Sequence, residues 1–148
     1  MKNTIQKKES IEEFNKEVSM LDKFRNEYIV QFYGAVFIPN KICMVTEYAP
    51  FGSLNDLIMK KYKDNPISEK VRIKMLIDCA KGISYLHNNG ILHRDIKPDN
   101  FLIFDIQNTD KTIINSKLTD FGSSRNINML MTNMTFTKGV GTAIFMSP

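Results

Sequence analysis

Cysteine is scarce in this sequence, and that scarcity limits the protein classes to which it can belong. Two cysteines, Cys43 and Cys79, occur among 148 residues, and they form no Cys-x-x-Cys pair. A disulfide framework is therefore excluded. The sequence predicts instead two small buried thiols in a reducing compartment.

Long hydrophobic runs are also lacking. No apolar stretch approaches the ~18 residues that a membrane-spanning helix needs. Residues 1–10 contain no apolar core of the kind found in a signal peptide. There is no internal repeat and no low-complexity tract. The sequence also has no G-x-x-x-x-G-K-[ST] loop, which argues against a P-loop nucleotide enzyme.

The composition that remains is that of one globular domain. Apolar residues make up 43% of the chain and charged residues 24%, which excludes extensive disorder. The 20 basic residues outnumber the 16 acidic ones and give a net charge of +4. These basic residues are scattered, so no nucleic-acid partner is expected.

An amphipathic helix is expected from Ser10 onward. Ser10 and Glu13 have the spacing of a capping box, and apolar residues follow at helical intervals. Glu17 lies on or beside the apolar stripe. A carboxylate on the buried side needs a partner, whereas one at the rim can reach water, and the spacing leaves both interpretations open.

A β-hairpin is expected next, over residues 30–38 and 41–48, because these stretches have the composition of strands and a Pro-Asn turn separates them. Residues 49–52 (Ala-Pro-Phe-Gly) interrupt the pattern and are the best candidate for a boundary between two lobes. Ser53 has the position of an N-cap for a short helix.

The longest expected helix begins after a second N-cap, Ser68, and ends at an Asn-Asn-Gly stop over residues 88–90. Short strands are expected over residues 91–92, 101–104 and 113–118. The polar segment 123–141 is expected to be a long loop, and loops of that length are usually functional or mobile.

Two short motifs carry the chemistry. Residues 93–100 read His-Arg-Asp-Ile-Lys-Pro-Asp-Asn, and residues 120–122 read Asp-Phe-Gly. Either motif alone is a weak signal, but their joint occurrence, in this order and on loops that end strands, is specific. In these residues the sequence resembles the eukaryotic protein kinases, whose catalytic loop is H-R-D-x-x-x-x-N and whose metal loop is D-F-G.

The resemblance covers nearly the whole chain. It includes residues 45–49 and 52–54 around the hinge, the end of the long C-lobe helix (82–87) and the loop that leads into the A-P-E motif (141–148). It implies an α+β, two-lobed kinase fold that is truncated at both ends. Residues 1–148 would form one partial kinase domain, with residues 1–48 in the N-lobe, 49–52 at the hinge and 53–148 in the C-lobe.

The resemblance implies a role for each polar residue of the two motifs. Asp95 would accept the proton of the attacking hydroxyl or orient it, and Lys97 would stabilise the charge of the transferring phosphate. Asn100 and Asp120 would hold Mg²⁺, which takes oxygen ligands. Asp and Asn also cap turns often, but three such caps on the kinase pattern by chance are improbable.

The substrate class and a regulatory role follow from the same resemblance. Lys97-Pro98 and Thr142 resemble the serine/threonine kinases, and the hinge and first helix resemble their tyrosine-kinase-like group, with dual specificity left open. Arg94 beside Asp95 is typical of kinases that are switched by activation-loop phosphorylation, because the arginine would meet the phosphate. The candidate acceptors are Thr132, Thr135 and Thr137, and each can equally be a plain polar loop residue.

The resemblance also assigns the nucleotide site. Glu17 matches the helix glutamate that pairs with the ATP-binding lysine, and Thr46 matches the gatekeeper behind the adenine pocket. Glu47 and Ala49 would offer backbone groups to adenine, so their side-chain identities carry little information. The hydrophobic spine would consist of Leu21, Phe32, His93 and Phe121.

Some parts of the family pattern are missing or displaced. No G-x-G-x-x-G loop precedes Glu17, and the strand lysine is either Lys2 or a lysine upstream of the chain. The chain stops at Pro148, before the glutamate of A-P-E. The segment between Asn100 and Asp120 is longer than the family usually shows, and the extra residues receive no function.

The implied function is transfer of the ATP γ-phosphate to Ser/Thr hydroxyls of protein substrates, with Mg²⁺, in intracellular signalling. The expected partners are ATP and a protein substrate, with no nucleic acid and no membrane contact from this segment, and the expected location is cytoplasmic. The alternative is a catalytically dead kinase fragment or pseudokinase that acts as an interaction module. The intact motifs argue against that alternative, and the missing parts argue for it.

Overall fold

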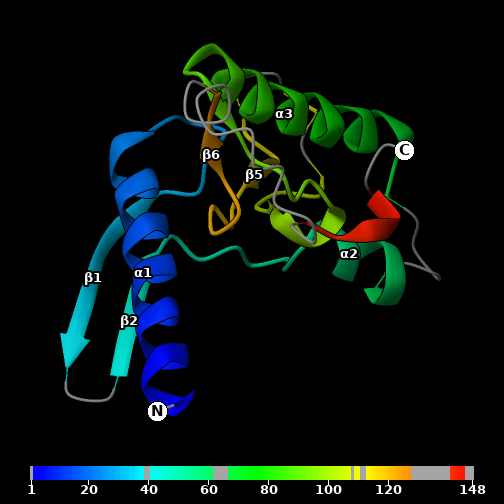
Figure 1. Cartoon of the computed structure of the whole chain (residues 1–148). Helices are drawn as coiled ribbons and strands as arrows, with labels where there is room; N and C mark the ends of the chain where they lie inside the picture. Colours follow the sequence, from blue (N-terminus) through cyan, green and yellow to red (C-terminus); the bar gives the residue numbers. More distant parts are fainter. Residues whose placement is uncertain are drawn as a thin grey trace.

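The computed structural model of the chain describes residues 2–38, 41–61, 67–107, 109–110, 113–127 and 141–145. It places a long helix beside a β-hairpin, and next to them a second long helix with short strands and turns (Figure 1). The predicted α+β class is confirmed. Within these ranges no helix combines the length and apolar content that crossing a membrane requires.

The first helix, α1 (Lys2–Lys23), is longer than predicted. The capping-box prediction at Ser10 is wrong, because Ser10 lies inside α1. Residues 2–9 contain several Lys, Gln and Glu residues, which favour helix, so the helix continues upstream of the box. The C-terminal part of α1 buries Leu21, and the next turn buries Phe24.

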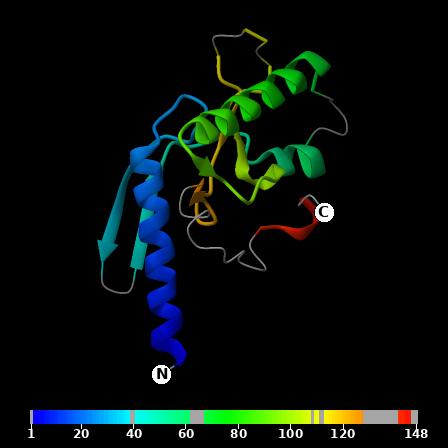
Figure 2. The same ribbon diagram turned by 45° about the horizontal axis from the view of Figure 1, so that its top comes forward.

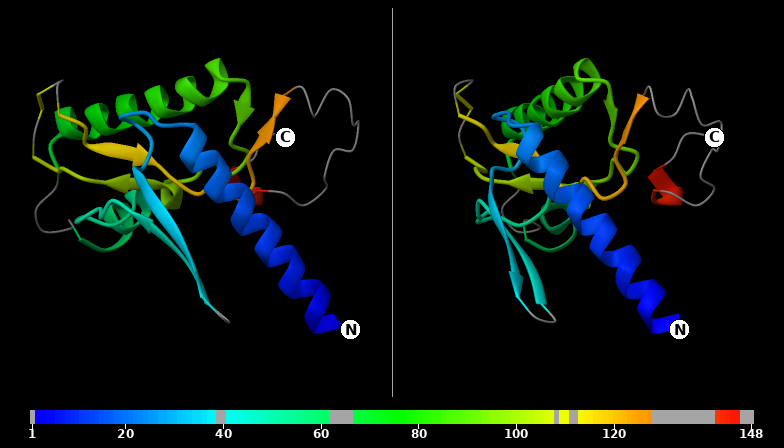
Figure 3. Two further views of the ribbon diagram at one scale, coloured as in Figure 1. Left: turned by 90° about the vertical axis from the view of Figure 1, so that its left-hand side faces the viewer. Right: turned by 60° about the vertical axis from the view of Figure 1, so that its left-hand side comes forward.

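The predicted hairpin is confirmed. Strands β1 (Phe32–Ile38) and β2 (Lys41–Thr46) pair antiparallel, and both lie alongside α1 in the two views of Figure 3. Ala35 and its cross-strand partner Met44 pack against the core, whereas Val36 and Val45 are exposed. This alternation is that of a sheet with one buried face.

The second long helix, α3 (Glu69–Asn88), begins where predicted, because the Ser68 side chain accepts a hydrogen bond from Val71 N at 3.4 Å. Ser53 likewise caps α2 through a capping box. The remaining elements are α2 (Leu54–Asp56), the π-helical turn η1 (Leu57–Lys61), β3 (Ile91–Leu92), the 3₁₀ turn η2 (Pro98–Asn100), β4 (Phe101–Ile103), β5 (Ser116–Leu118), β6 (Arg125–Asn126) and the 3₁₀ turn η3 (Ala143–Phe145).

The loop between α1 and β1 joins the two groups of elements. Tyr28 O accepts from Leu118 N at 2.9 Å, and Val30 N donates to Leu118 O at 3.0 Å. The same loop lies so close to α3 that a Cβ on Gly82 would sit 2.9 Å from Tyr28 O. Leu118 is fully buried at this junction, which fixes α1 relative to α3.

Three predictions of detail need correction. Strand β5 begins at Ser116 rather than residue 113, because Ile113 N donates to Asp110 O in a turn. Part of the predicted loop 123–141 is a strand, since β6 pairs with β3. Cys43 is half-buried, whereas Cys79 is buried as predicted, and burial raises the pKa of the Cys79 thiol to about 11.

Candidate active site

Residues 93–100 occupy the turn between β3 and β4. His93 is buried directly after β3, and Arg94 takes a left-handed backbone conformation with φ of 67°. That conformation is uncommon for a residue with a side chain. The chain then folds back on itself, and the side-chain amide of Asn100 donates to Asp95 O at 2.8 Å.

Asp95 is the centre of a hydrogen-bonded cluster. Its Oδ2 lies 2.7 Å from Lys97 Nζ and 3.3 Å from Asn100 Nδ2. Its Oδ1 accepts from Thr142 Oγ1 at 2.7 Å, and Lys97 Nζ donates to the same hydroxyl at 3.0 Å. The structure thus brings the predicted Asp95, Lys97 and Asn100 together and adds Thr142, because η3 lies beside η2 (Figures 1 and 2).

The charges in this cluster stabilise one another. Burial opposes ionisation of Asp95, but hydrogen bonds from Lys97 and Thr142 outweigh that effect and hold the pKa of Asp95 below its ordinary value. The hydrogen bond to Asp95 raises the pKa of Lys97. At neutral pH the pair is therefore a carboxylate and an ammonium ion. A carboxylate offers about four acceptor positions, and Lys97, Asn100 and Thr142 occupy three of them among the described residues.

Asp120 reaches the same region from β5. Because β4 and β5 are antiparallel, the residues before β4 meet those after β5, and Thr119 N donates to Asn100 O at 2.9 Å. Asp120 follows with φ of 62°, and its Oδ1 accepts from Gly122 N at 3.3 Å. Asn100 and Asp120 therefore lie at the same end of the β4–β5 strand pair. The predicted metal site requires this proximity.

The donor set at this end of the strand pair fits a magnesium ion. Asn100 supplies an amide oxygen and Asp120 a carboxylate, and both are hard oxygen ligands. In the described part of the chain, no three His, Cys, Asp or Glu side chains converge into a cage. Mg²⁺ usually binds through one or two side chains and completes its octahedron with water and phosphate oxygens, which agrees with a site of this kind.

The residues predicted to form a spine are all buried behind the two loops. Leu21, Phe32 and Phe121 belong to one core cluster, and His93 is 2% exposed. The rings of His93 and Phe121 make an edge contact with centroids 5.4 Å apart. His93 Nε2 also contacts Thr119 O at 2.9 Å, and burial lowers the pKa of His93. The catalytic and metal loops are thereby tied to the core.

Glu17 of α1 is half-buried next to the metal loop. Burial and the nearby carboxylate of Asp120 raise the pKa of Glu17, and a hydrogen bond from the backbone N–H of Phe121 opposes the rise. Of the two interpretations that the spacing left open, the structure favours the one in which Glu17 has a partner on the buried side.

Lys2 does not occupy a strand, so the expectation that it is the strand lysine is wrong for this structure. Lys2 is the first residue of α1 and shares that helix with Glu17. At ~1.5 Å of rise per residue, the two positions are ~22 Å apart along the helix axis. An unbroken helix keeps them apart, because its rise per residue is fixed.

The residues predicted to contact adenine lie where the hairpin ends. Thr46 is the last residue of β2, and Ala49 is half-buried in the following segment. Sequence analysis missed a role for the Glu47 side chain, which accepts from Gln31 N at 2.6 Å and pairs with Lys117 Nζ at 2.7 Å. No local sequence pattern relates Glu47 to Lys117, so this pairing could not be found beforehand.

Arg94 holds the start of the segment that follows Asp-Phe-Gly. Its Nε donates to Ser123 O at 2.8 Å, and burial lowers the pKa of Arg94. The three candidate phosphorylation sites, Thr132, Thr135 and Thr137, lie outside the described residues.

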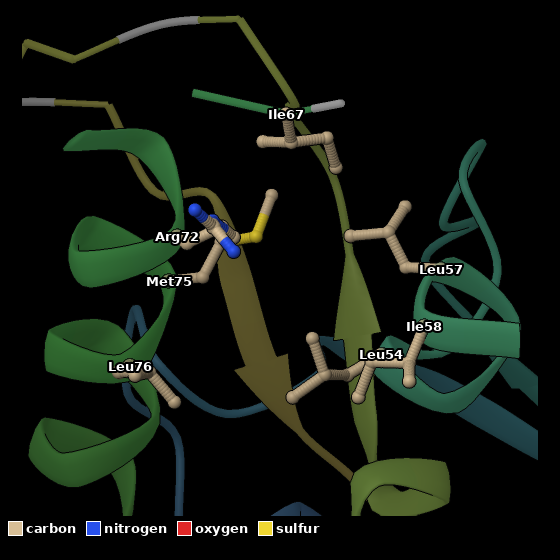
Figure 4. A pocket seen from close by; sticks show the side chains of 7 residues that line it. All are labelled: Leu54, Leu57, Ile58, Ile67, Arg72, Met75 and Leu76. Carbon is tan, nitrogen blue, oxygen red and sulfur yellow. The ribbon is translucent and has the colours of Figure 1, made fainter. Parts of the chain in front are cut away.

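A separate apolar pocket of about 390 Å³ lies between α3 on one side and α2 with η1 on the other (Figure 4). Its lining residues are Leu54, Leu57, Ile58, Ile67, Arg72, Met75 and Leu76. Arg72 is the only charged residue among them, and none belongs to the two motifs. Among the described residues, its lining therefore offers no acid or metal ligand for the predicted chemistry.

Comparison with known proteins identifies relatives of the chain. The family model of the protein kinase domain matches residues 1–148. The probable serine/threonine-protein kinase gdt9 of Dictyostelium discoideum is 34% identical over 92% of this chain and 10% of its own length. The probable serine/threonine-protein kinase SIS8 of Arabidopsis thaliana is 39% identical over 95% of this chain and 13% of its own length. The chain thus spans roughly a tenth of the length of these curated relatives.

Proposed function

The chain belongs to the protein kinase domain family, and from that premise we propose that it transfers the γ-phosphate of ATP to Ser/Thr hydroxyls of protein substrates. By family it is a serine/threonine-protein kinase, as its curated relatives are named. The observation that carries the proposal is the cluster in which Lys97, Asn100 and Thr142 bind the Asp95 carboxylate and hold it in one orientation.

Asp95 would receive the substrate hydroxyl. A carboxylate whose pKa is held below the ordinary value is a weak base, so its first contribution is to orient the hydroxyl toward the phosphate, and it accepts the proton as the bond forms. Thr142 and Lys97 hold the carboxylate in place. The Lys97 ammonium also supplies positive charge where negative charge develops on the transferring group.

Asn100 and Asp120 would hold the magnesium ion, which neutralises phosphate charge when it is bound. Thr46, Glu47 and Ala49 are the residues that we propose for the adenine side. They lie at the end of β2 and in the segment that follows it, and their assignment to adenine rests on the resemblance. Glu17 belongs to the same proposed site through its contact with Phe121.

We further propose a division of the chain into an N-lobe part (1–48), a hinge (49–52) and a C-lobe part (53–148), with a role in intracellular signalling in the cytoplasm. The packing of α1 against the hairpin supports the first boundary. The bond from Arg94 to Ser123 supports control through the segment after the metal loop, since an ordered arginine there can meet a phosphate.

Nucleotide binding and phosphoryl transfer test the proposal separately. In a thermal-shift assay we expect Mg²⁺-ATP to stabilise the 148-residue chain and Asp120→Ala to abolish that shift. A Ser/Thr peptide mixture should become phosphorylated, and Asp95→Asn should lower the rate about 10²–10⁴-fold while the Mg²⁺-ATP shift persists.

A shift without phosphorylation would favour the alternative, an interaction module that binds nucleotide but does not transfer phosphate. The absence of any shift in the wild-type chain would contradict a working nucleotide site.

A further inference from the structure

A lysine in the middle of α1 contacts the backbone of the metal loop. Lys16 Nζ donates to Gly122 O at 3.2 Å, and the backbone N–H of Phe121 in the same loop lowers the pKa of the neighbouring Glu17. Both side chains are half-buried. The Lys16 bond crosses 106 positions of sequence, so it is a tertiary contact rather than a feature of the helix.

The loop that these residues contact has a conformation that needs support. Asp120 is a non-glycine residue with φ of 62°, a region that side chains disfavour. Two short-range bonds lie within the loop: Asp120 Oδ1 accepts from Gly122 N at 3.3 Å, and Phe121 O accepts from Ser124 N at 3.0 Å. Such backbone strain persists only where surrounding structure holds it.

We propose that Lys16 is a positioning residue that clamps the turn Asp120–Gly122 to α1, so that the Asp120 carboxylate is held where it can bind the metal. A bond from an ammonium group to a carbonyl is a charge-assisted hydrogen bond, and it is stronger than a neutral one. Lys16 also brings positive charge to the loop where Glu17 and Asp120 lie near one another. This inference rests on the proposed function for its metal, but the clamp itself is a property of the chain.

Hydrogen exchange tests the clamp without nucleotide. In the 148-residue chain, Lys16→Met keeps the length of the side chain and removes the donor. We expect amides of residues 119–124 to exchange about 10-fold faster in this variant, which is the effect of losing one bond to a charged group. Exchange in α3 should be unchanged, which shows that the variant is folded, and Lys16→Arg should restore slow exchange.

Lys23→Met is the matched control, because Lys23 is an exposed lysine at the C-terminal end of α1 that lies over the Phe24 ring. It should leave exchange in residues 119–124 unchanged. Equal exchange in Lys16→Met and wild type, or an equal increase in Lys23→Met, would overturn the clamp.

Binding of ADP with and without Mg²⁺ tests the consequence for the metal. Lys16→Met should weaken Mg²⁺-ADP binding about 10-fold and leave metal-free ADP binding unchanged, and Lys16→Arg should rescue it. Faster exchange with unaltered Mg²⁺-ADP affinity would overturn the positioning role. A wild-type chain that binds no ADP would contradict the proposed function and the metal-positioning role together, whereas the exchange result would still decide whether the clamp exists.

Discussion

The hydroxyl of Thr142 donates a hydrogen bond to the carboxylate of Asp95 at 2.7 Å, although 47 positions separate the two residues. Lys97 contacts both partners, so the three side chains form a closed ring. The ring fixes the direction of the Asp95 carboxylate, which is what orientation of a substrate hydroxyl requires.

Removal of the Thr142 hydroxyl should therefore impair phosphoryl transfer. We expect Thr142→Val to lower kcat/KM for a serine peptide about 10–100-fold, because a hydrogen bond to a charged group contributes about 1.5–3 kcal/mol. Thr142→Ser keeps the hydroxyl and is the control. The measurement is peptide phosphorylation at saturating Mg²⁺-ATP, and equal rates for the valine variant and wild type would contradict the role of the ring.

The buried ring of His93 should make the stability of the chain depend on pH. Burial holds the pKa of His93 below 6.5. Just below pH 6.5, His93 is therefore protonated in the unfolded chain but still neutral in the folded chain. The contribution of neutral His93 is complete above pH 6.5 and is lost as the pH falls through its lower folded pKa.

The test is the slope of the unfolding free energy between pH 7.5 and pH 5, measured by urea denaturation. His93→Phe should make this slope smaller. His87→Phe makes the same substitution at an exposed position of α3 and is the matched control. A wild-type slope in the His93 variant would show that burial of this ring does not control its titration.

The contact between Lys117 and Glu47 should stabilise the fold. Both side chains are less than one-fifth exposed, and Lys117 Nζ also lies 4.8 Å from the centre of the Phe104 ring. We expect Lys117→Met to lower the unfolding free energy by about 2 kcal/mol, because Glu47 keeps its charge and loses its cation.

The exposed pair of Arg25 and Asp22 offers the matched control. Its side chains are 60% and 63% exposed, and exposed ion pairs contribute only about 0–1 kcal/mol. Arg25→Met should therefore change the unfolding free energy much less than Lys117→Met. Equal losses of unfolding free energy in the two variants would mean that burial does not make the Lys117–Glu47 pair more stabilising than an exposed pair.

Lys74→Met should destabilise the fold strongly. Lys74 Nζ contacts Asp78 at 2.8 Å, and the Asp78 side chain is fully buried. Removing one partner of a buried ion pair costs about 3–5 kcal/mol, because the other charge stays buried without compensation. Adding Asp78→Asn should recover part of the loss, and both variants can be compared by urea denaturation.

The same variant should loosen the long turn before β5. Lys74 Nζ donates to Ile113 O at 2.7 Å, and Asp78 accepts from Asn115 N at 2.8 Å, so the pair ties this turn to α3. Limited proteolysis should therefore cut Lys74→Met within residues 105–115 sooner than wild type. An unchanged digestion pattern would contradict this tie.

The sequence by itself determined the elements that depend on neighbouring residues. The start of α3 at Ser68, the cap at Ser53 and the β1–β2 hairpin follow from local capping, turn and strand patterns, and the structure confirms each. Residues 93–100 and 120–122 were predicted on loops after strands, and they lie there. Local patterns suffice in these cases because the interacting residues are only a few positions apart in the sequence.

Only the tertiary structure decided the contacts between distant positions. Neither the bond of Thr142 to Asp95, nor the pair of Glu47 and Lys117, nor the contact of Lys16 with Gly122 has a sequence signal. Each depends on how helices and strands pack, and packing is set by the whole core rather than by a local pattern. The upstream extension of α1 and the pairing of β6 were missed for related reasons: helix propensity outweighed a capping box, and a strand of two residues exists only through its partner.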